Sequence, residues 1–220
     1  MKIELRFNQN FLSISASSAS EWSVSKNFAP ELTAHQLEVP AAVFRYLGEA
    51  TLTPRPIGAV IGCRASSPRF SPAVQAQAKA FGKLLAEHGF ITLTGGLSGV
   101  MEVAAQGAKA ARGLTLGILP GSEKAAANAS LDIVLPSGIG IARNYLIAQA
   151  ADVLIAVNGG RGTLEEMSYG LDFEKPVYSL GSWDCLPEVV QLAREEEIVV
   201  PLKELLARAL HAQLLKEHHA

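Results

Sequence analysis

The chain has 220 residues, of which 49% are hydrophobic. This suffices for the core of one domain with some additional peripheral elements. Its net charge of −2 gives no electrostatic reason to expect nucleic acid or an anionic membrane as a partner, although a local basic pocket stays compatible with it. Cys63 and Cys185 form no CxxC pair, and neither a signal peptide nor a membrane-spanning run is recognisable, so we expect a cytoplasmic protein.

Residues 1–53 differ in pattern from the rest of the chain. Residues 2–7 alternate apolar and polar side chains, and a turn signal precedes a returning strand at 11–15 and a third short strand at 21–24. Residues 37–47 suit a short helix or a strand. The segment carries no catalytic signature. We therefore expect a small β-rich extension that serves as an accessory layer, a dimer contact or a ligand lid.

Beyond a proline-marked boundary at 51–56, strands and helices alternate. Short apolar strands are predicted at 57–61, 90–94, 114–119, 131–135, 153–157 and 175–180. Helices are predicted at 73–88, 100–111, 141–150, 163–171, 186–197 and 202–217. Short, wholly apolar strands separated by helices indicate an α/β fold, in which residues 54–220 form a Rossmann-like, doubly wound parallel sheet with helices on both faces.

Turn residues follow four of the predicted strands directly. Such sheets bind ligands at the carboxyl ends of their strands, where the strand order reverses. A single glycine there is compatible with a plain turn, but four strand ends on one edge indicate a shared pocket. The residues that we expect at this edge are Gly62, Gly95, Gly96, Gly99, Pro120, Gly159 and Gly160, and we assign ligand or phosphate binding to the first four of them.

The stretch Gly-Gly-Arg-Gly-Thr at 159–163 passes from a strand into a helix. Its backbone N–H groups and the positive helix end suit a phosphate, and the Thr163 hydroxyl is a further donor. We therefore assign phosphate binding to Gly159, Gly160, Gly162 and Thr163, the alternative being a turn that holds no ligand. The chain has neither GxGxxG after its first apolar strand nor GxxxxGK[ST], which argues against NAD and P-loop nucleotide hydrolysis.

Two charged residues flank this turn. Arg143 lies near the start of a helix and can clamp a phosphate, or else form a surface ion pair. Glu166 lies in the first turn of the next helix, where the dipole favours acids anyway; it can also act as a general base or stabilise a cationic sugar. Arg64 and Lys124 can add positive charge at the pocket rim. Cys63 suits a buried small hydrophobe, and no metal-ligand spacing occurs.

Four segments occur in the order found in one known family: Thr94–Glu102, Gly117–Gly121, Gly138–Asn144 and Gly159–Glu166. Together they resemble the LOG-like (LONELY GUY) superfamily, also called lysine decarboxylase-like, and most of all its branch of molybdenum-cofactor carrier proteins. The resemblance implies a Rossmann-like fold and a homodimer or higher homo-oligomer. No pyridoxal-binding lysine signature is visible, so the decarboxylase label gains no support.

The resemblance leaves two functions open. Phosphoribohydrolases of this superfamily hydrolyse the N-glycosidic bond of nucleoside 5′-monophosphates, and Arg143 and Glu166 match their catalytic pair. Asn158 and Asn144 replace a proline and a lysine of their pattern, and Arg-Asn is typical of the carrier branch. We expect a hydrolase that requires no cofactor and takes a nucleotide monophosphate. The alternative is a non-catalytic protein that holds molybdenum cofactor, and a third candidate is a nucleotide-sensing module.

Overall fold

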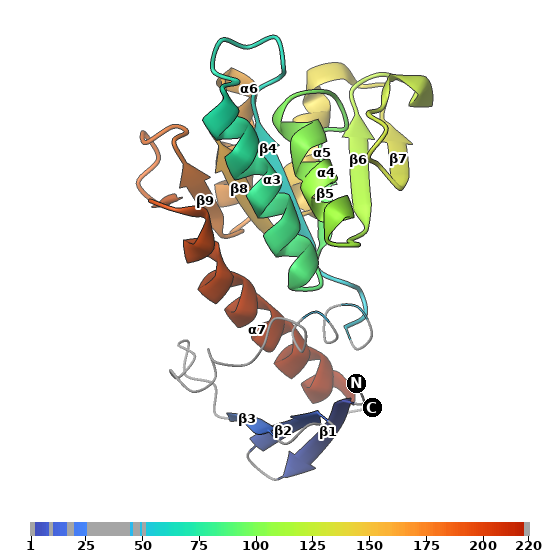
Figure 1. Ribbon diagram of the computed structural model, residues 1–220, viewed down its shortest axis with the longest axis vertical. Coiled ribbons are helices and arrows are strands. Elements are labelled where there is room, and N and C mark those ends of the chain that lie inside the picture. Colours follow the sequence, from blue (N-terminus) through green and yellow to red (C-terminus); the bar gives the residue numbers. More distant parts are fainter. Residues whose placement is uncertain are drawn as a thin grey trace.

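The computed structural model describes residues 3–8, 11–16, 20–25, 45, 49 and 52–217. The first three segments are strands β1 (Ile3–Asn8), β2 (Phe11–Ala16) and β3 (Ser20–Ser25), which pair antiparallel in the order β1-β2-β3. The predicted strands of the extension are thereby confirmed. Figure 1 shows this small sheet at the lower end of the molecule, beside the end of α7. The element predicted at 37–47 lies outside the described residues, apart from Arg45.

The rest of the described chain is built on a seven-stranded parallel sheet with the order β10-β9-β8-β4-β5-β6-β7. From β4 the chain first winds toward β7 and then returns to β8 on the other side of β4, so the strand order reverses between β4 and β8. This is the predicted doubly wound α/β fold. The strands are β4 (Ile57–Gly62), β5 (Ile91–Thr94), β6 (Thr115–Leu119), β7 (Ile133–Pro136), β8 (Val153–Val157), β9 (Val177–Leu180) and β10 (Val190–Gln191).

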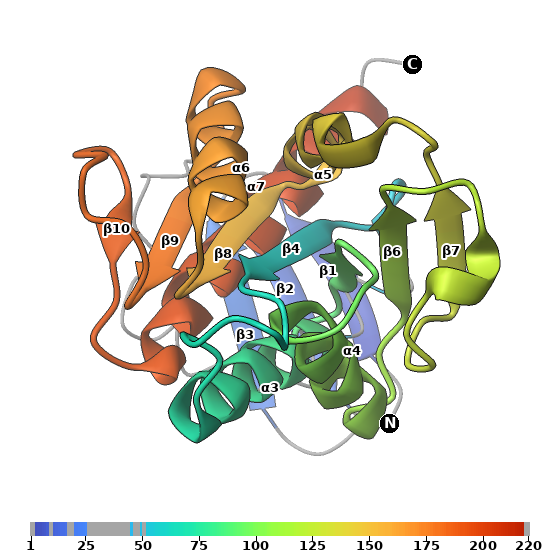
Figure 2. The same cartoon turned by 90° about the horizontal axis from the view of Figure 1, so that it is seen from above.

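Helices cover both faces of this sheet (Figure 2). One core joins the sheet to α3 (Pro72–Glu87), α4 (Val100–Ala110) and α7 (Val199–Glu217), and the other joins it to α5 (Arg143–Ala150) and α6 (Arg161–Asp172). Adjacent residues of β4 point into opposite cores, because side chains alternate along a strand: Val60 packs with the first group and Ile61 with the second. The described residues also contain the 3₁₀ turns η2 (Lys124–Ala126), η3 (Gly140–Ala142) and η4 (Glu195–Ile198).

The helix predicted at 186–197 is wrong. The segment instead forms the edge strand β10 and the turn η4. Gln191 lies opposite Ser179 of β9, and the Leu192 amide donates to the Ser179 carbonyl at 2.8 Å. Val189 is buried in the core on the α5–α6 face. Pairing with the edge of the sheet therefore outweighs the helical spacing of the apolar residues.

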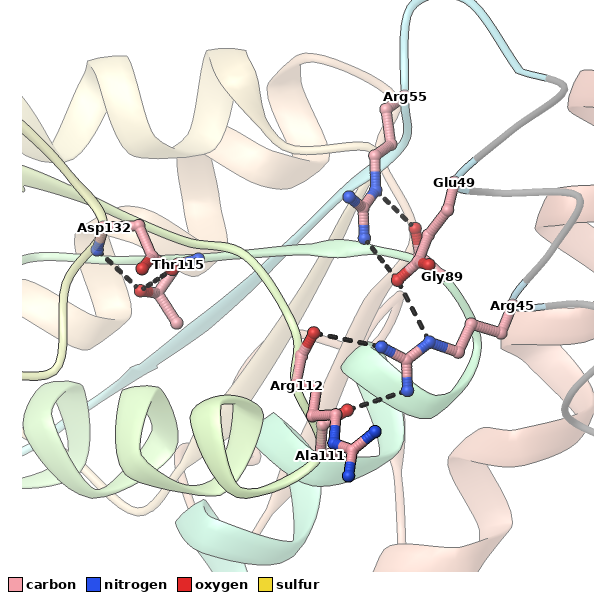
Figure 3. Close-up of polar contacts among 8 residues, drawn as sticks. All are labelled: Arg45, Glu49, Arg55, Gly89, Ala111, Arg112, Thr115 and Asp132. Carbon is pink, nitrogen blue, oxygen red and sulfur yellow. Dashed lines mark hydrogen bonds and ion pairs between the residues drawn. The ribbon is translucent and has the colours of Figure 1, made fainter.

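Three charged residues form a cluster at the amino edge of the sheet, and two of them bind the backbone that follows α3 and α4. Arg45 donates from Nη1 to the Ala111 carbonyl at 2.8 Å and from Nη2 to the Arg112 carbonyl at 3.0 Å. Arg55 donates from Nε to the Gly89 carbonyl at 2.9 Å, and Glu49 bridges Arg45 and Arg55 at 3.1 Å to each (Figure 3). We call Arg45, Glu49 and Arg55 the amino-edge cluster.

None of the helices in the described part of the chain combines the length and the apolar character that crossing a lipid bilayer would require. Nor do residues 52–217 bring together three His, Cys, Asp or Glu side chains in a way that could hold a metal ion.

Candidate functional site

A pocket of about 360 Å³ opens at the carboxyl edge of the sheet, where the strand order reverses. Ligands of open α/β sheets bind at this position, and the volume lies within the range of small-molecule sites. The pocket is lined by the ends of β4, β5, β6 and β8 and by residues of α4, η3, α5 and α6. The lining residues are Ile61, Gly62, Cys63, Arg64, Ser66, Ser67, Gly95, Met101, Pro120, Ile141, Arg143, Asn144, Gly160, Gly162, Thr163 and Glu166.

The start of α6 presents unused backbone donors to this pocket. Its N-cap, Gly160, offers no side chain to satisfy them, and among the described residues the N–H groups of Arg161, Gly162 and Thr163 have no acceptor. The carbonyl of Gly160 is held by the indole N–H of Trp183 at 2.9 Å, which fixes the turn. Free N–H groups at a fixed helix N-terminus form a site for an anion.

Arg143 and Glu166 form a buried ion pair in the pocket wall, with 3.1 Å between Nη1 and Oε1 and side-chain exposures of 8% and 7%. The Nε of Arg143 is buried without a hydrogen-bond partner, and Nη2 makes only a long contact of 3.9 Å with the sulfur of Met101. The guanidinium lies so close to Gly95 that a Cβ there would overlap it. The pocket thus contains a cation whose hydrogen-bonding capacity is only partly used.

Burial changes the acid–base properties of both partners. It raises the pKa of Glu166 to about 7, although the Arg143 charge and hydrogen bond act in the opposite direction and Glu165 adds to the rise. Burial also lowers the pKa of Arg143, which Glu166 opposes and the charge of Arg64 reinforces. A carboxyl group with a pKa near neutrality can give or take a proton at physiological pH, as general acid–base catalysis requires.

The two asparagines that depart from the phosphoribohydrolase pattern have structural roles. Asn144 donates from Nδ2 to Oε2 of Glu165 at 3.1 Å and, more weakly, to the Gly162 carbonyl at 3.4 Å, which connects α5 to α6. Asn158 has φ 50°, and its Oδ1 accepts from the Gly159 amide at 2.7 Å. Proline is restricted to φ near −65°, so this turn excludes the proline of that pattern at position 158.

The structure brings most of the predicted site residues together. The pocket is lined by Gly62, Gly95, Arg143, Gly160, Gly162, Thr163 and Glu166 and by the predicted rim residue Arg64, whereas Lys124 is not among the lining residues. Gly96, Gly99 and Gly159 also do not line it. They shape the turns behind its wall: the Gly96 carbonyl accepts from Asn128, and Gly99 precedes α4.

Several lining residues were not predicted. Ser66 and Ser67 follow β4, and their position directly after a strand of the binding edge was the available indication. Met101 and Ile141 lie within the segments Thr94–Glu102 and Gly138–Asn144, which carry the family resemblance, but no role was assigned to them. Trp183 holds Gly160 from 23 residues away along the chain, through a contact that only the folded structure reveals.

Known proteins share this fold over most of their length. The molybdenum cofactor binding protein of Rippkaea orientalis is 35% identical, with a TM-score of 0.63 over 69% of this chain and 97% of that one. The molybdenum cofactor carrier protein of Chlamydomonas reinhardtii is 34% identical, with a TM-score of 0.62 over 69% and 99%. An uncharacterized protein of Archaeoglobus fulgidus is 44% identical over 99 residues, which span 45% of this chain and 65% of that protein.

The model of the SLOG cluster4 family matches residues 55–207, the part of the chain that contains the parallel sheet and the pocket. Together with the solved structures, this match confirms the resemblance to the LOG-like superfamily near its molybdenum-cofactor carrier branch. The chain belongs to the SLOG cluster4 family.

Proposed function

We propose that the pocket binds a small phosphorylated ligand of nucleotide type, with its phosphate on the N-terminus of α6. The observation that carries the proposal is the meeting of two independent groups of donors in one pocket. The free N–H groups of Arg161, Gly162 and Thr163 come from α6, and the unpaired Nε of Arg143 comes from α5. Both are donors, and a phosphate supplies several strong acceptor oxygens.

We favour molybdenum cofactor as the ligand and carriage as the role. This proposal is supported by two solved structures that are about 35% identical over nearly their whole length, a molybdenum cofactor binding protein and a molybdenum cofactor carrier protein. It is also supported by Asn144, which occupies the position of the lysine in the hydrolase pattern and is engaged with Glu165.

The second candidate is the phosphoribohydrolase that the sequence predicts. Its support is the Arg143–Glu166 pair, because the raised pKa of Glu166 suits a group that activates water beside a breaking glycosidic bond. Positive charge that develops on the ribose would be stabilised by the carboxylate. Neither role requires a nucleic acid partner.

The test exposes the full chain to molybdenum cofactor and to AMP and other nucleoside monophosphates, and measures bound ligand and released free base. For a carrier we expect bound cofactor and no free base. Free base that Glu166→Gln abolishes would establish the hydrolase instead. For either ligand, Gly160→Val should weaken binding at least about tenfold, which corresponds to roughly 1.4 kcal/mol.

Gly160 is suited to this substitution because a Cβ there meets nothing closer than Nη1 of Arg69 at 3.9 Å. The fold therefore accepts the larger side chain, and only a ligand at the turn is displaced. Gly121→Val is the matched control, since a Cβ on Gly121 meets nothing within 4 Å and this residue does not line the pocket. Equal affinity in the wild type and Gly160→Val would contradict the phosphate site.

We also propose that the chain forms a homodimer or higher homo-oligomer. Apolar side chains are exposed along η3 and α5 beside the pocket, among them Ile139 at 49%, Ile141 at 66% and Tyr145 at 45%. Exposed apolar clusters commonly mark protein contacts. A monomeric molar mass in light scattering would contradict this proposal.

A further inference from the structure

The loop between β4 and α3 carries two arginines whose charges are uncompensated. We call residues 63–71 the rim loop. Arg64 lines the pocket, and Nη1 of Arg69 lies 3.9 Å from the place that a Cβ on Gly160 would occupy. Both residues are exposed, and within residues 52–217 neither side chain has a hydrogen bond or ion pair. The two guanidinium groups therefore remain free to bind an anion.

The rim loop is held in place by its own hydrogen bonds. The Ser67 amide donates to the Arg64 carbonyl, and the Phe70 amide donates to the Ser67 carbonyl, each at 3.0 Å. At its start, the carbonyl of Cys63 accepts from the Val100 amide at 3.0 Å. The loop also packs onto Gly99, where a Cβ would stand 2.5 Å from the Cys63 carbonyl oxygen. The backbone that bears the two arginines is thus ordered before any ligand arrives.

The charges of the pocket and of its mouth are not balanced. Among the described residues that line the pocket, Glu166 is the only acidic one, and its charge is opposed by Arg143. A phosphate on the N-terminus of α6 has the free N–H groups of the helix as its donors, so the donors of the rim arginines remain for a further anionic group. The two arginine cations lie beside the start of α6, so they attract a second anionic group next to the phosphate that binds there.

We propose that Arg64 and Arg69 form a second anion subsite, so that the pocket prefers ligands in which a pyrophosphate replaces the single phosphate. The inner phosphoryl group lies on the N-terminus of α6, and the outer one contacts the rim loop. This inference rests on the proposed function, because it needs the phosphate site at α6. It adds a preference within the ligand class: a nucleoside diphosphate or another pyrophosphate ester binds more tightly than the matching monoester, which still binds at α6.

The test compares two pairs of probes by calorimetry on the full chain: inorganic phosphate with pyrophosphate, and AMP with ADP. We expect the member with two phosphoryl groups to bind about tenfold more tightly in each pair that binds. The double substitution Arg64→Gln and Arg69→Gln should abolish that preference and change the affinity for phosphate or AMP by no more than about threefold. The matched control is Arg112→Gln with Arg194→Gln, which also removes two positive charges, but from residues that do not line the pocket.

The outcomes separate the two proposals. Equal affinities within each pair in the wild type would overturn the second subsite and leave the phosphate site standing. So would a rim variant that weakens both members by the same factor, or a control variant that removes the preference as well. Failure of all four probes to bind would overturn the phosphate site together with the subsite.

Discussion

The two edges of the parallel sheet use arginine in opposite ways. At the amino edge, Arg45 and Arg55 bind the Ala111, Arg112 and Gly89 carbonyls and share Glu49 (Figure 3). At the carboxyl edge, the Nε of Arg143 is unpaired, and within residues 52–217 the side chains of Arg64 and Arg69 have no partner.

Helix direction explains this difference. In a parallel α/β fold the helices run against the strands, so their C-terminal carbonyls gather at the amino edge and their N-terminal N–H groups at the carboxyl edge. Carbonyl oxygens can satisfy an arginine, whereas N–H groups cannot. A buried arginine at the carboxyl edge therefore needs an acid or an anionic ligand, and Arg143 has Glu166. The exposed Arg64 and Arg69 have water instead, and their donors remain available to an anionic ligand.

The largest expected difference comes from removing one arginine at each edge. Arg143→Ala leaves Glu166 buried without its partner, and we expect the free energy of unfolding to fall by roughly 3 kcal/mol. Pyrophosphate affinity should fall by roughly 30-fold, since a hydrogen bond to a charged group contributes about 2 kcal/mol. Arg55→Ala should lower stability by about 1 kcal/mol and leave the affinity unchanged. Urea unfolding and calorimetry measure both quantities.

A similar loss of pyrophosphate affinity in Arg143→Ala and Arg55→Ala would contradict the proposed difference between the two edges of the sheet. Should Arg143→Ala fail to fold, Arg143→Lys keeps the charge but loses the planar fork of donors. A folded Arg143→Lys protein with full pyrophosphate affinity would then contradict the role of the guanidinium.

The next effect is the pH dependence that Glu166 imposes. Its pKa is about 7 in the folded protein and near 4.5 when the chain is unfolded. Between these values the folded state holds a proton that the unfolded state releases, so stability is greatest below pH 4.5 and declines as the pH rises to 7. The loss amounts to about 3 kcal/mol. Glu166→Gln should remove this decline in urea unfolding from pH 5 to 8. Parallel pH profiles for the two proteins would show that Glu166 is not its source.

Sequence reasoning succeeded where one local pattern decides the structure. The apolar runs that form β4, β5, β6 and β8 are buried on both faces of the sheet. A strand in the middle of the sheet is the structure that buries all of their apolar side chains. The glycine turn at 159–163 and the pair Arg143–Glu166 were likewise predicted, since each stands in a recognisable motif. The structure brings both to one pocket.

Sequence reasoning failed where a distant partner decides. Residues 186–197 have helical spacing, but β9 offered an unpaired edge that captured Val190 and Gln191. The amino-edge cluster depends on backbone carbonyls up to 67 residues away along the chain. Every residue has a backbone carbonyl, so the sequence does not show which of them an arginine binds. Within residues 52–217 the side chains of Arg64 and Arg69 have no hydrogen-bond or ion-pair partner, and only the folded structure can show this.

The smallest expected effect compares two residues with left-handed backbone, one at each edge. Arg112, with φ 60°, follows the C-cap of α4 and contributes only its carbonyl to Arg45. Arg112→Gly removes the strain of a Cβ in this conformation and should raise stability by about 0.5–1 kcal/mol. Asn158→Gly relieves the same strain but loses the hydrogen bond to the Gly159 amide, so the two effects should nearly cancel.

The two glycine variants should also differ in ligand binding. Asn158→Gly frees the turn that precedes Gly160, and a looser turn orders its N–H groups less well around an anion. We expect pyrophosphate affinity to fall about threefold in Asn158→Gly and to stay unchanged in Arg112→Gly. The reverse pattern in calorimetry would mean that the amino edge also controls the pocket. The arginines there would then be linked to ligand binding along α4, which lies between Gly99 beside the rim loop and Arg112.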